Sequence, residues 1–199
     1  MNELLRPPFL PVTTQAAEGL RRRRFTVAEI ESMVAGGIIS EDERIELIGG
    51  EVVPMSPKGR RHEVLRSELA FALSRRCPEH LKVATETPLK LAADNAPEPD
   101  IIVFPASLKA PDVDGTSVLL VIEIADTSLA YDIGTKAPIY AAQGVREYWV
   151  INANTLETTI HREPVGSAYR TVTTAGADIR LVPHLAPELD VRLADIQLD

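Results

Sequence analysis

The chain has 199 residues, 45% of them hydrophobic and 25% charged, with a formal net charge of −8. This is the profile of one ordinary globular domain with a true core, and the acidic balance argues against non-specific coating of nucleic acid. No stretch approaches the ~20 apolar residues of a membrane helix, and the single cysteine, Cys77, excludes an internal disulfide.

The N-terminal segment, residues 1–24, is predicted to be a flexible arm. It contains three prolines and ends in a basic run at residues 21–24. It lacks the apolar core of a signal peptide, so we expect a cytoplasmic protein with no membrane partner, in keeping with the sparse use of cysteine. Residues 25–199 are expected to form a single domain.

Two short elements are predicted at the start of this domain. Thr26 and Glu29 stand at the spacing of a capping box, which begins a helix, and two glycines at residues 36–37 end it. Residues 44–55 surround a second glycine pair, at residues 49–50, which is typical of a β-hairpin with a tight turn.

A longer helix and two strands are predicted next. Residues 58–76 carry apolar side chains at helical spacing and stop before Pro78, so we expect an amphipathic helix there. Strands are predicted at residues 81–86 and near residues 89–91.

Two apolar runs then indicate buried strands that each carry a carboxylate. Residues 98–104 hold Asp100 near their start, directly after a proline, and residues 117–125 hold Glu123 near their end. Burying an ionised carboxylate costs several kcal/mol unless it has a partner. Two such carboxylates on neighbouring strands favour a shared cation, and a divalent metal there indicates hydrolysis of a phosphodiester.

The last third of the chain is predicted as a helix followed by strands. The helix spans residues 133–143, with Lys136 at its start, and a strong strand follows at residues 146–152. Weaker alternating strands, which predict a meander, lie at residues 156–161, 168–173 and 179–182. Together the elements predict an α/β fold: a mixed β-sheet flanked by helices, with additional antiparallel strands.

The order of these motifs resembles the PD-(D/E)xK nuclease superfamily and, more closely, its Uma-two family of predicted restriction endonucleases. The resemblance covers about residues 25–152 and is carried by Ile45-Glu46-Leu47-Ile48-Gly49-Gly50-Glu51, Ser56-Pro57 leading to His62, Glu98-Pro99-Asp100, Val121-Ile122-Glu123-Ile124, Tyr131-Asp132 with Lys136, and Gly144-Val145-Arg146-Glu147-Tyr148-Trp149-Val150.

The chain departs from the superfamily pattern at one position and from the family pattern at another. In the superfamily a lysine usually stands two residues after the second acid, but Ala125 occupies that position here. In the Uma-two family a lysine on the following helix takes this role, and Lys136 matches it. Pro138 stands where helix-forming residues are usual, and it is tolerated only in the first turn of a helix.

The resemblance implies a restriction-endonuclease-like fold and a Mg²⁺-dependent endonuclease that hydrolyses DNA, with Mn²⁺ as a substitute metal. Asp100, Glu123 and the backbone carbonyl of Ile124 would hold the metal. Lys136 would orient the attacking water or stabilise the transition state, and Glu46 would complete the acidic cluster. The residues implied to bind the substrate are Lys58, Arg61 and His62. A homodimer is expected as the arrangement that suits cutting both strands.

Two other functions remain open at this point. A nuclease fold without catalysis, serving as a binding or assembly module, would fit the missing in-strand lysine and the acidic balance. An unrelated metal hydrolase acting on small phosphates would use the same carboxylates. Taken singly, Glu46 could be a solvent-facing hairpin residue, and Asp132 with Lys136 could be an ordinary ion pair along a helix.

Overall fold

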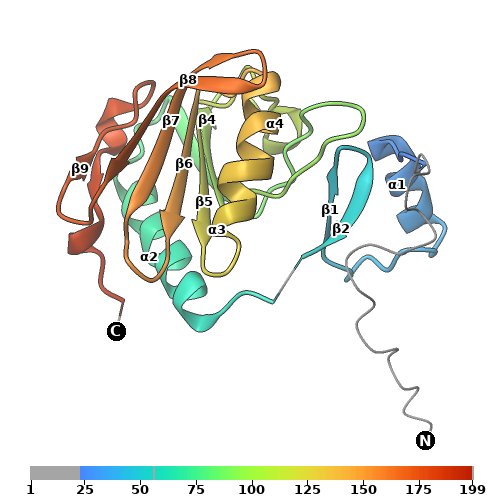
Figure 1. The fold of residues 1–199 in the computed structure, drawn as a ribbon, viewed down its shortest axis with the longest axis horizontal. Helices are drawn as coiled ribbons and strands as arrows, with labels where there is room; N and C mark the ends of the chain where they lie inside the picture. Colours follow the sequence, from blue (N-terminus) through green and yellow to red (C-terminus); the bar gives the residue numbers. More distant parts are fainter. Residues whose placement is uncertain (1–22, 56, 199) are drawn as a thin grey trace, which may run out of the picture.

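The structure is a computed structural model and describes residues 23–55 and 57–198. The predicted arm, residues 1–24, therefore lies almost wholly outside the described residues. Figure 1 shows a twisted sheet with helices on both faces, and a helix and hairpin from the start of the domain on one side of it. Within the described part of the chain, no helix is long and apolar enough to cross a membrane.

The first helix, α1 (Val27–Ala35), begins where the capping box predicts it. The Thr26 hydroxyl accepts a hydrogen bond from the backbone N–H of Glu29, and the Glu29 carboxylate accepts one from the backbone N–H of Thr26. Both donors would otherwise be unsatisfied in the first turn of a helix. The predicted helix start is therefore confirmed.

The predicted hairpin is also present. β1 (Ile45–Ile48) and β2 (Glu51–Pro54) pair antiparallel on either side of Gly49 and Gly50. Both glycines have positive φ values, as a two-residue hairpin turn of this kind requires. The guanidinium of Arg24 donates a hydrogen bond to the carbonyl of Gly49, and a Cβ at Gly50 would lie 2.6 Å from the Cβ of Arg24.

The central sheet has six strands, and its order along the sheet follows the chain. The strands are β3 (Leu81–Thr85), β4 (Ile101–Pro105), β5 (Leu120–Ala125), β6 (Glu147–Asn152), β7 (Thr158–Val165) and β8 (Ala168–Ala175). Only β5 and β6 pair in parallel within this sheet, and every other neighbouring pair is antiparallel. A parallel pair needs a long crossover connection, and here the crossover is helical.

Helices cover both faces of the sheet (Figure 1). On one face, α2 (Arg60–Arg76) buries Leu65, Leu69 and Leu73 in a cluster with side chains of β4, β5 and β6. Each fully buried leucine contributes roughly 2 kcal/mol of burial energy. The other face carries the crossover, which consists of α3 (Leu129–Tyr131), η3 (Asp132–Lys136) and α4 (Ala137–Ala142).

Three parts of the predicted secondary structure are wrong in detail. Residues 89–91 form no strand, because their backbone groups pair with the nearby loop, as in the bond from Leu89 N–H to the carbonyl of Pro97. The crossover helix begins at Leu129, four residues before its predicted start. The strand predicted at residues 179–182 shortens to β9 (Arg180–Leu181) and pairs with the chain's last strand, outside the main sheet.

The C-terminal segment completes the core on the α2 side of the sheet. It consists of β9, η4 (Pro187–Leu189), β10 (Val191–Arg192) and η5 (Leu193–Asp195). Elsewhere in the chain, a short 3-10 turn, η2 (Ala110–Asp112), lies between β4 and β5. Leu181, Leu189, Val191 and Leu193 are buried in the same cluster as the leucines of α2.

Pro138 is accommodated by a change of helix type. Residues 132–136 form a π turn, in which the backbone N–H of Ala137 donates to the carbonyl of Asp132, five residues earlier. Pro138 then occupies the first turn of α4, where its missing N–H is least costly. Helical backbone therefore continues on both sides of Lys136, and both Asp132 and Lys136, at the two ends of the π turn, are buried.

A buried histidine interrupts a row of aromatic rings on the crossover side of the sheet. The ring centroid of His161 lies 5.3 Å from that of Tyr148 and 5.4 Å from that of Tyr169. Its side chain is buried, and burial lowers the pKa of His161 because the charged imidazolium loses hydration. The folded protein therefore favours the neutral ring.

This burial predicts a loss of stability in acid. Below the ordinary histidine pKa, His161 is protonated in the unfolded chain but stays neutral in the folded protein. The free energy of unfolding therefore decreases as the pH is lowered, by at most about 1.4 kcal/mol per pH unit. Between about pH 7.5 and about pH 5.5, urea unfolding should show a smaller drop for His161→Gln than for the wild type. The exposed His80→Gln should keep the wild-type drop, and an equal drop in all three proteins would contradict the prediction.

Candidate active site

A cavity of about 460 Å³ opens between the hairpin, the start of α2, the facing ends of β4 and β5, and the crossover helix. Its lining is strongly acidic. The six acidic residues that line it are Glu46, Glu98, Asp100, Glu123, Asp126 and Asp132, against three residues with basic side chains, Lys58, His62 and Lys136. Six acidic residues therefore face three basic ones in this cavity.

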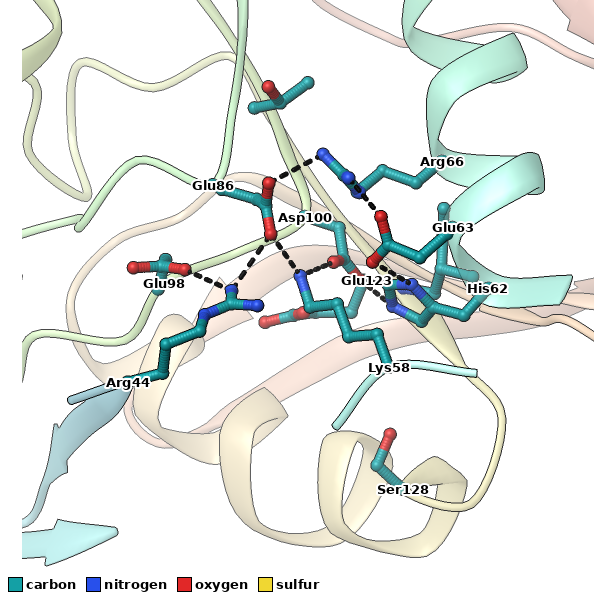
Figure 2. A network of polar contacts seen from close by, with 12 residues as sticks. Arg44, Lys58, His62, Glu63, Arg66, Glu86, Glu98, Asp100, Glu123 and Ser128 are labelled. Carbon is teal, nitrogen blue, oxygen red and sulfur yellow. Dashed lines mark hydrogen bonds and ion pairs between the residues drawn. The ribbon is translucent and has the colours of Figure 1, made fainter. Parts of the chain in front are cut away.

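Asp100 lies directly before β4 and is nearly fully buried at 3% exposure. Its Oδ1 accepts a hydrogen bond from Lys58 Nζ at 2.8 Å, and its Oδ2 lies 3.0 Å from His62 Nε2 (Figure 2). The backbone N–H of Ile124 donates to the same Oδ2 at 2.7 Å. Burial by itself would raise the pKa of Asp100, but the contacts with His62 and Lys58 outweigh it and hold that pKa below its usual value.

Glu123 projects from β5 toward the crossover helix, on the same face of the strand as Val121. Its Oε1 accepts hydrogen bonds from Lys136 Nζ at 2.9 Å and from the Tyr140 hydroxyl at 3.1 Å. Lys136 Nζ also donates to Glu46 Oε1 at 2.9 Å, across 90 positions of the sequence. One buried ammonium group therefore bridges the hairpin and the central sheet.

The ammonium group of Lys136 carries one positive charge but lies within 4 Å of three carboxylates. Asp132 Oδ1 also lies 3.9 Å from Lys136 Nζ, so Glu46, Glu123 and Asp132 share a single cation. Burial raises the pKa of Glu123 to about 8, and burial also raises the pKa of Asp132. The negative partners outweigh the effect of burial on Lys136 and raise its pKa, so the amine stays protonated.

A peptide oxygen joins the carboxylates at the end of the sheet. Pairing of β4 with β5 stops at Ile101 and Ile122, and Ile124 follows two positions later. Because the N–H and C=O of one strand residue face the same neighbouring strand, the Ile124 carbonyl faces the β4 side, as its N–H does toward Asp100. Ile124 lines the cavity together with Asp100 and Glu123.

His62 stands in the first turn of α2 and links Asp100 to the helix. Besides the contact of Nε2 with Asp100, its Nδ1 lies 3.6 Å from Glu63 Oε1. His62 Nδ1 is buried and has no hydrogen-bond partner among the residues that the structure describes. His62 therefore fixes the Asp100 carboxylate against the first turn of α2 through Nε2.

The structure brings most of the sequence-predicted site residues to one place. The cavity is lined by Glu46, Lys58, His62, Asp100, Glu123, Ile124 and Lys136. Arg61 is not among the lining residues and its side chain is exposed. Among the described residues, no group of three or more His, Cys, Asp or Glu side chains is already arranged around a metal position.

Three polar residues of the site were not among the predicted site residues, although Tyr131 and Asp132 belong to a motif that carries the family resemblance. Asp132 and Tyr131 line the cavity, and Tyr140 donates to Glu123. The Tyr131 hydroxyl is buried without a hydrogen-bond partner among residues 23–55 and 57–198. Asp132 and Lys136 stand four positions apart, a spacing that taken singly also allows an ordinary ion pair along a helix, but both side chains are buried and both line the cavity.

Comparison with known proteins gives a family and a fold. The sequence profile of the Uma2 family, described as "Putative restriction endonuclease", matches residues 27–194. The crystal structure of a putative nuclease belonging to DUF820 from Anabaena variabilis ATCC 29413 has a TM-score of 0.67 at 18% sequence identity. The matched region covers 86% of the present chain and 96% of the Anabaena chain. No curated protein matches. The predicted fold class and the predicted family are confirmed.

Proposed function

This chain belongs to the Uma2 family of putative restriction endonucleases, and we propose that it is an endonuclease that uses Mg²⁺ to hydrolyse phosphodiester bonds in DNA. The observation that supports this most is the meeting of Asp100 and Glu123 in one cavity beside Lys136. The homodimer expected from the sequence remains part of the proposal, because cutting both strands of a duplex calls for two sites.

The donor set of the cavity fits a magnesium ion. Mg²⁺ prefers oxygen ligands and usually takes one or two carboxylates with several waters. Asp100, Glu123 and the carbonyl of Ile124 supply such oxygens, and the excess of carboxylates over cations around Lys136 leaves negative charge for a metal to balance. Mn²⁺ accepts the same donors. Bound there, the metal would lower the pKa of a water ligand and offset charge on the phosphate.

The chain's own side chains supply the remaining roles. Lys136 has three N–H donors, two of which are held by Glu46 and Glu123, so the third can reach a phosphoryl oxygen. Glu46 holds this ammonium in place and also accepts a hydrogen bond from the backbone N–H of Glu98. His62 and Lys58 orient the Asp100 carboxylate through their contacts with it. Both residues line the cavity, so in this proposal they also contact the substrate.

A second candidate function rests on the same contacts. Asp100 is paired with Lys58 and His62, and Glu123 with Lys136, so each acid already has an internal cation. If no metal displaces these pairs, the protein is a catalytically silent nuclease fold that acts as a binding or assembly module. The two candidates differ in whether the cavity binds a divalent metal.

Metal titration with plasmid cleavage measured in parallel tests the proposal. Protein stripped of metal with EDTA should leave supercoiled plasmid intact, and added Mg²⁺ or Mn²⁺ should restore nicking. Isothermal titration calorimetry should detect metal binding over the same concentration range. If folded protein binds neither metal and cuts no DNA, the endonuclease is excluded and the silent module is favoured.

A further inference from the structure

Beside the cavity, three cationic side chains converge on one carboxylate, that of Glu86 (Figure 2). Its Oε1 accepts hydrogen bonds from Arg44 Nη2 and Lys58 Nζ, each at 2.9 Å. Its Oε2 lies 2.8 Å from Arg66 Nη1. Lys58 is the member of this cluster that also lines the cavity and donates to Asp100.

The cluster is assembled from four separate parts of the chain. Arg44 directly precedes β1, Lys58 precedes α2, Arg66 lies within α2, and Glu86 directly follows β3. Glu86 has a φ of 47°, a left-handed conformation that residues with side chains rarely adopt. Unfavourable backbone conformations of this kind concentrate at functional sites, where the surrounding contacts hold them.

The cluster is open to a ligand and keeps an unused donor. The side chains of Arg44 and Glu86 are 46% and 30% exposed, so an anion can approach from solvent. Arg66 Nε is buried and has no hydrogen-bond partner within the described part of the chain. Glu98 accepts a hydrogen bond from the same Arg44 Nη2 that donates to Glu86, and Glu63 contacts Arg66 Nη2 while Glu86 contacts Arg66 Nη1.

We propose that Arg44, Lys58 and Arg66 form a subsite for a backbone phosphate of nucleic acid beside the carboxylate cavity, and that the Glu86 carboxylate occupies this subsite in the free protein. A carboxylate and a phosphodiester each offer two acceptor oxygens and one negative charge, and guanidinium groups bind both in the same forked way. The inference rests on the proposed nuclease function for the identity of the substrate. It extends that function by naming where a phosphate away from the metal would be held.

Binding without metal tests the subsite separately from catalysis. Fluorescence anisotropy of a short labelled DNA duplex in EDTA reports affinity when no cleavage can occur. Glu86→Gln removes the competing charge but keeps the side-chain shape, and it should tighten duplex binding by about tenfold. Glu31→Gln is the matched control, because it makes the same charge change at an exposed ion pair with Lys90; it should stay within about twofold of the wild type.

Removal of a cation should have the opposite effect. Arg44→Gln should weaken duplex binding and lower the slope of log K against log salt concentration by about one. Arg44 is half exposed, so this variant is expected to fold even if Glu86→Gln does not. Arg23→Gln, at an exposed arginine paired with Glu29, is the matched control and should leave the slope unchanged.

Several results would overturn the subsite. One is that Glu86→Gln and Glu31→Gln change duplex affinity equally, and another is that Glu86→Gln weakens duplex binding. A third is that Arg44→Gln keeps the wild-type slope of log K against log salt concentration. If a mononucleotide at the same phosphate concentration displaces the duplex, the subsite recognises a single phosphate group. That result would overturn the assignment to a polynucleotide. Failure of the proposed function would look different, because it would leave these binding changes in place while no metal supported cleavage.

Discussion

Replacing Asp100 with asparagine is expected to lower metal-dependent DNA cleavage by at least about a thousandfold while the fold survives. Several kcal/mol of transition-state stabilisation depend on a divalent metal, and each 1.36 kcal/mol corresponds to a tenfold change in rate. Asparagine has the shape of aspartate but lacks the charge that a metal needs. Its amide oxygen can still accept the hydrogen bond from the backbone N–H of Ile124, which preserves the end of β5.

The matched control for this variant is Asp126→Asn. Asp126 lines the same cavity, and its Oδ1 accepts a hydrogen bond from the side chain of Asn154. This variant removes the same charge from the same cavity and should cleave plasmid at a rate close to that of the wild type. Cleavage assays should be accompanied by circular dichroism and by calorimetric titration of Mn²⁺. A folded Asp100→Asn protein that cuts DNA at the wild-type rate would show that Asp100 is not a metal ligand.

Lys136→Met is expected to have the largest effect on stability. It leaves Glu46 and Glu123 facing each other in a buried cluster without the cation that both now contact. Breaking a buried ion pair by removing one partner typically costs about 3–5 kcal/mol, because the remaining charge is buried without compensation. Methionine fills a similar volume, so the loss should come from charge and not from a cavity.

Urea unfolding of a double-mutant cycle checks this explanation. The double variant Lys136→Met with Glu123→Gln should recover part of the lost free energy of unfolding, because one of the uncompensated carboxylates is gone. Lys90→Met, at an exposed lysine paired with Glu31, should change stability by no more than about 0.5 kcal/mol. If the free energy of unfolding of Lys136→Met lies within about 1 kcal/mol of the wild-type value, the bridge between the hairpin and the sheet contributes no more to stability than an exposed ion pair does.

Electrostatics links the cavity and the cluster around Glu86. Lys58 donates to both Asp100 and Glu86, so it belongs to the acidic cavity and to the cationic cluster at once. Burial lowers the pKa of Lys58 by itself, but Asp100 and Glu86 outweigh that effect and raise it, so the ammonium persists. One ammonium group therefore couples the charge of the cavity to the charge of the cluster at Glu86.

Local sequence signals predicted the elements that depend on neighbouring residues. The Thr26 capping box and the Gly49-Gly50 turn each act over a few positions, and both form as predicted. The apolar runs around Asp100 and Glu123 also predicted two adjacent buried strands, because consecutive strands usually pair. The sequence therefore predicted that these two carboxylates lie close together, and both line the same cavity.

Other site residues depend on which helix face meets the sheet. Arg61, which the family resemblance implies in substrate binding, is exposed and lies outside the cavity lining, while Arg66 contacts Glu86. His62 and Arg66 stand four positions apart and therefore share one face of α2, whereas Arg61 lies about 100° away from His62.

By itself the sequence determined the fold class, the hairpin and the pair of buried acids, because these follow from short-range backbone preference and from the pattern of apolar side chains, and its ordered motifs indicated the family by resemblance. Only the tertiary structure decided that Lys136 bridges Glu46 and Glu123, that the crossover helix widens into a π turn before Pro138, and that Glu86 gathers three cations. Contacts between side chains far apart in the sequence depend on which surfaces finally pack together. No local pattern encodes that outcome, since the same charges could equally have faced solvent.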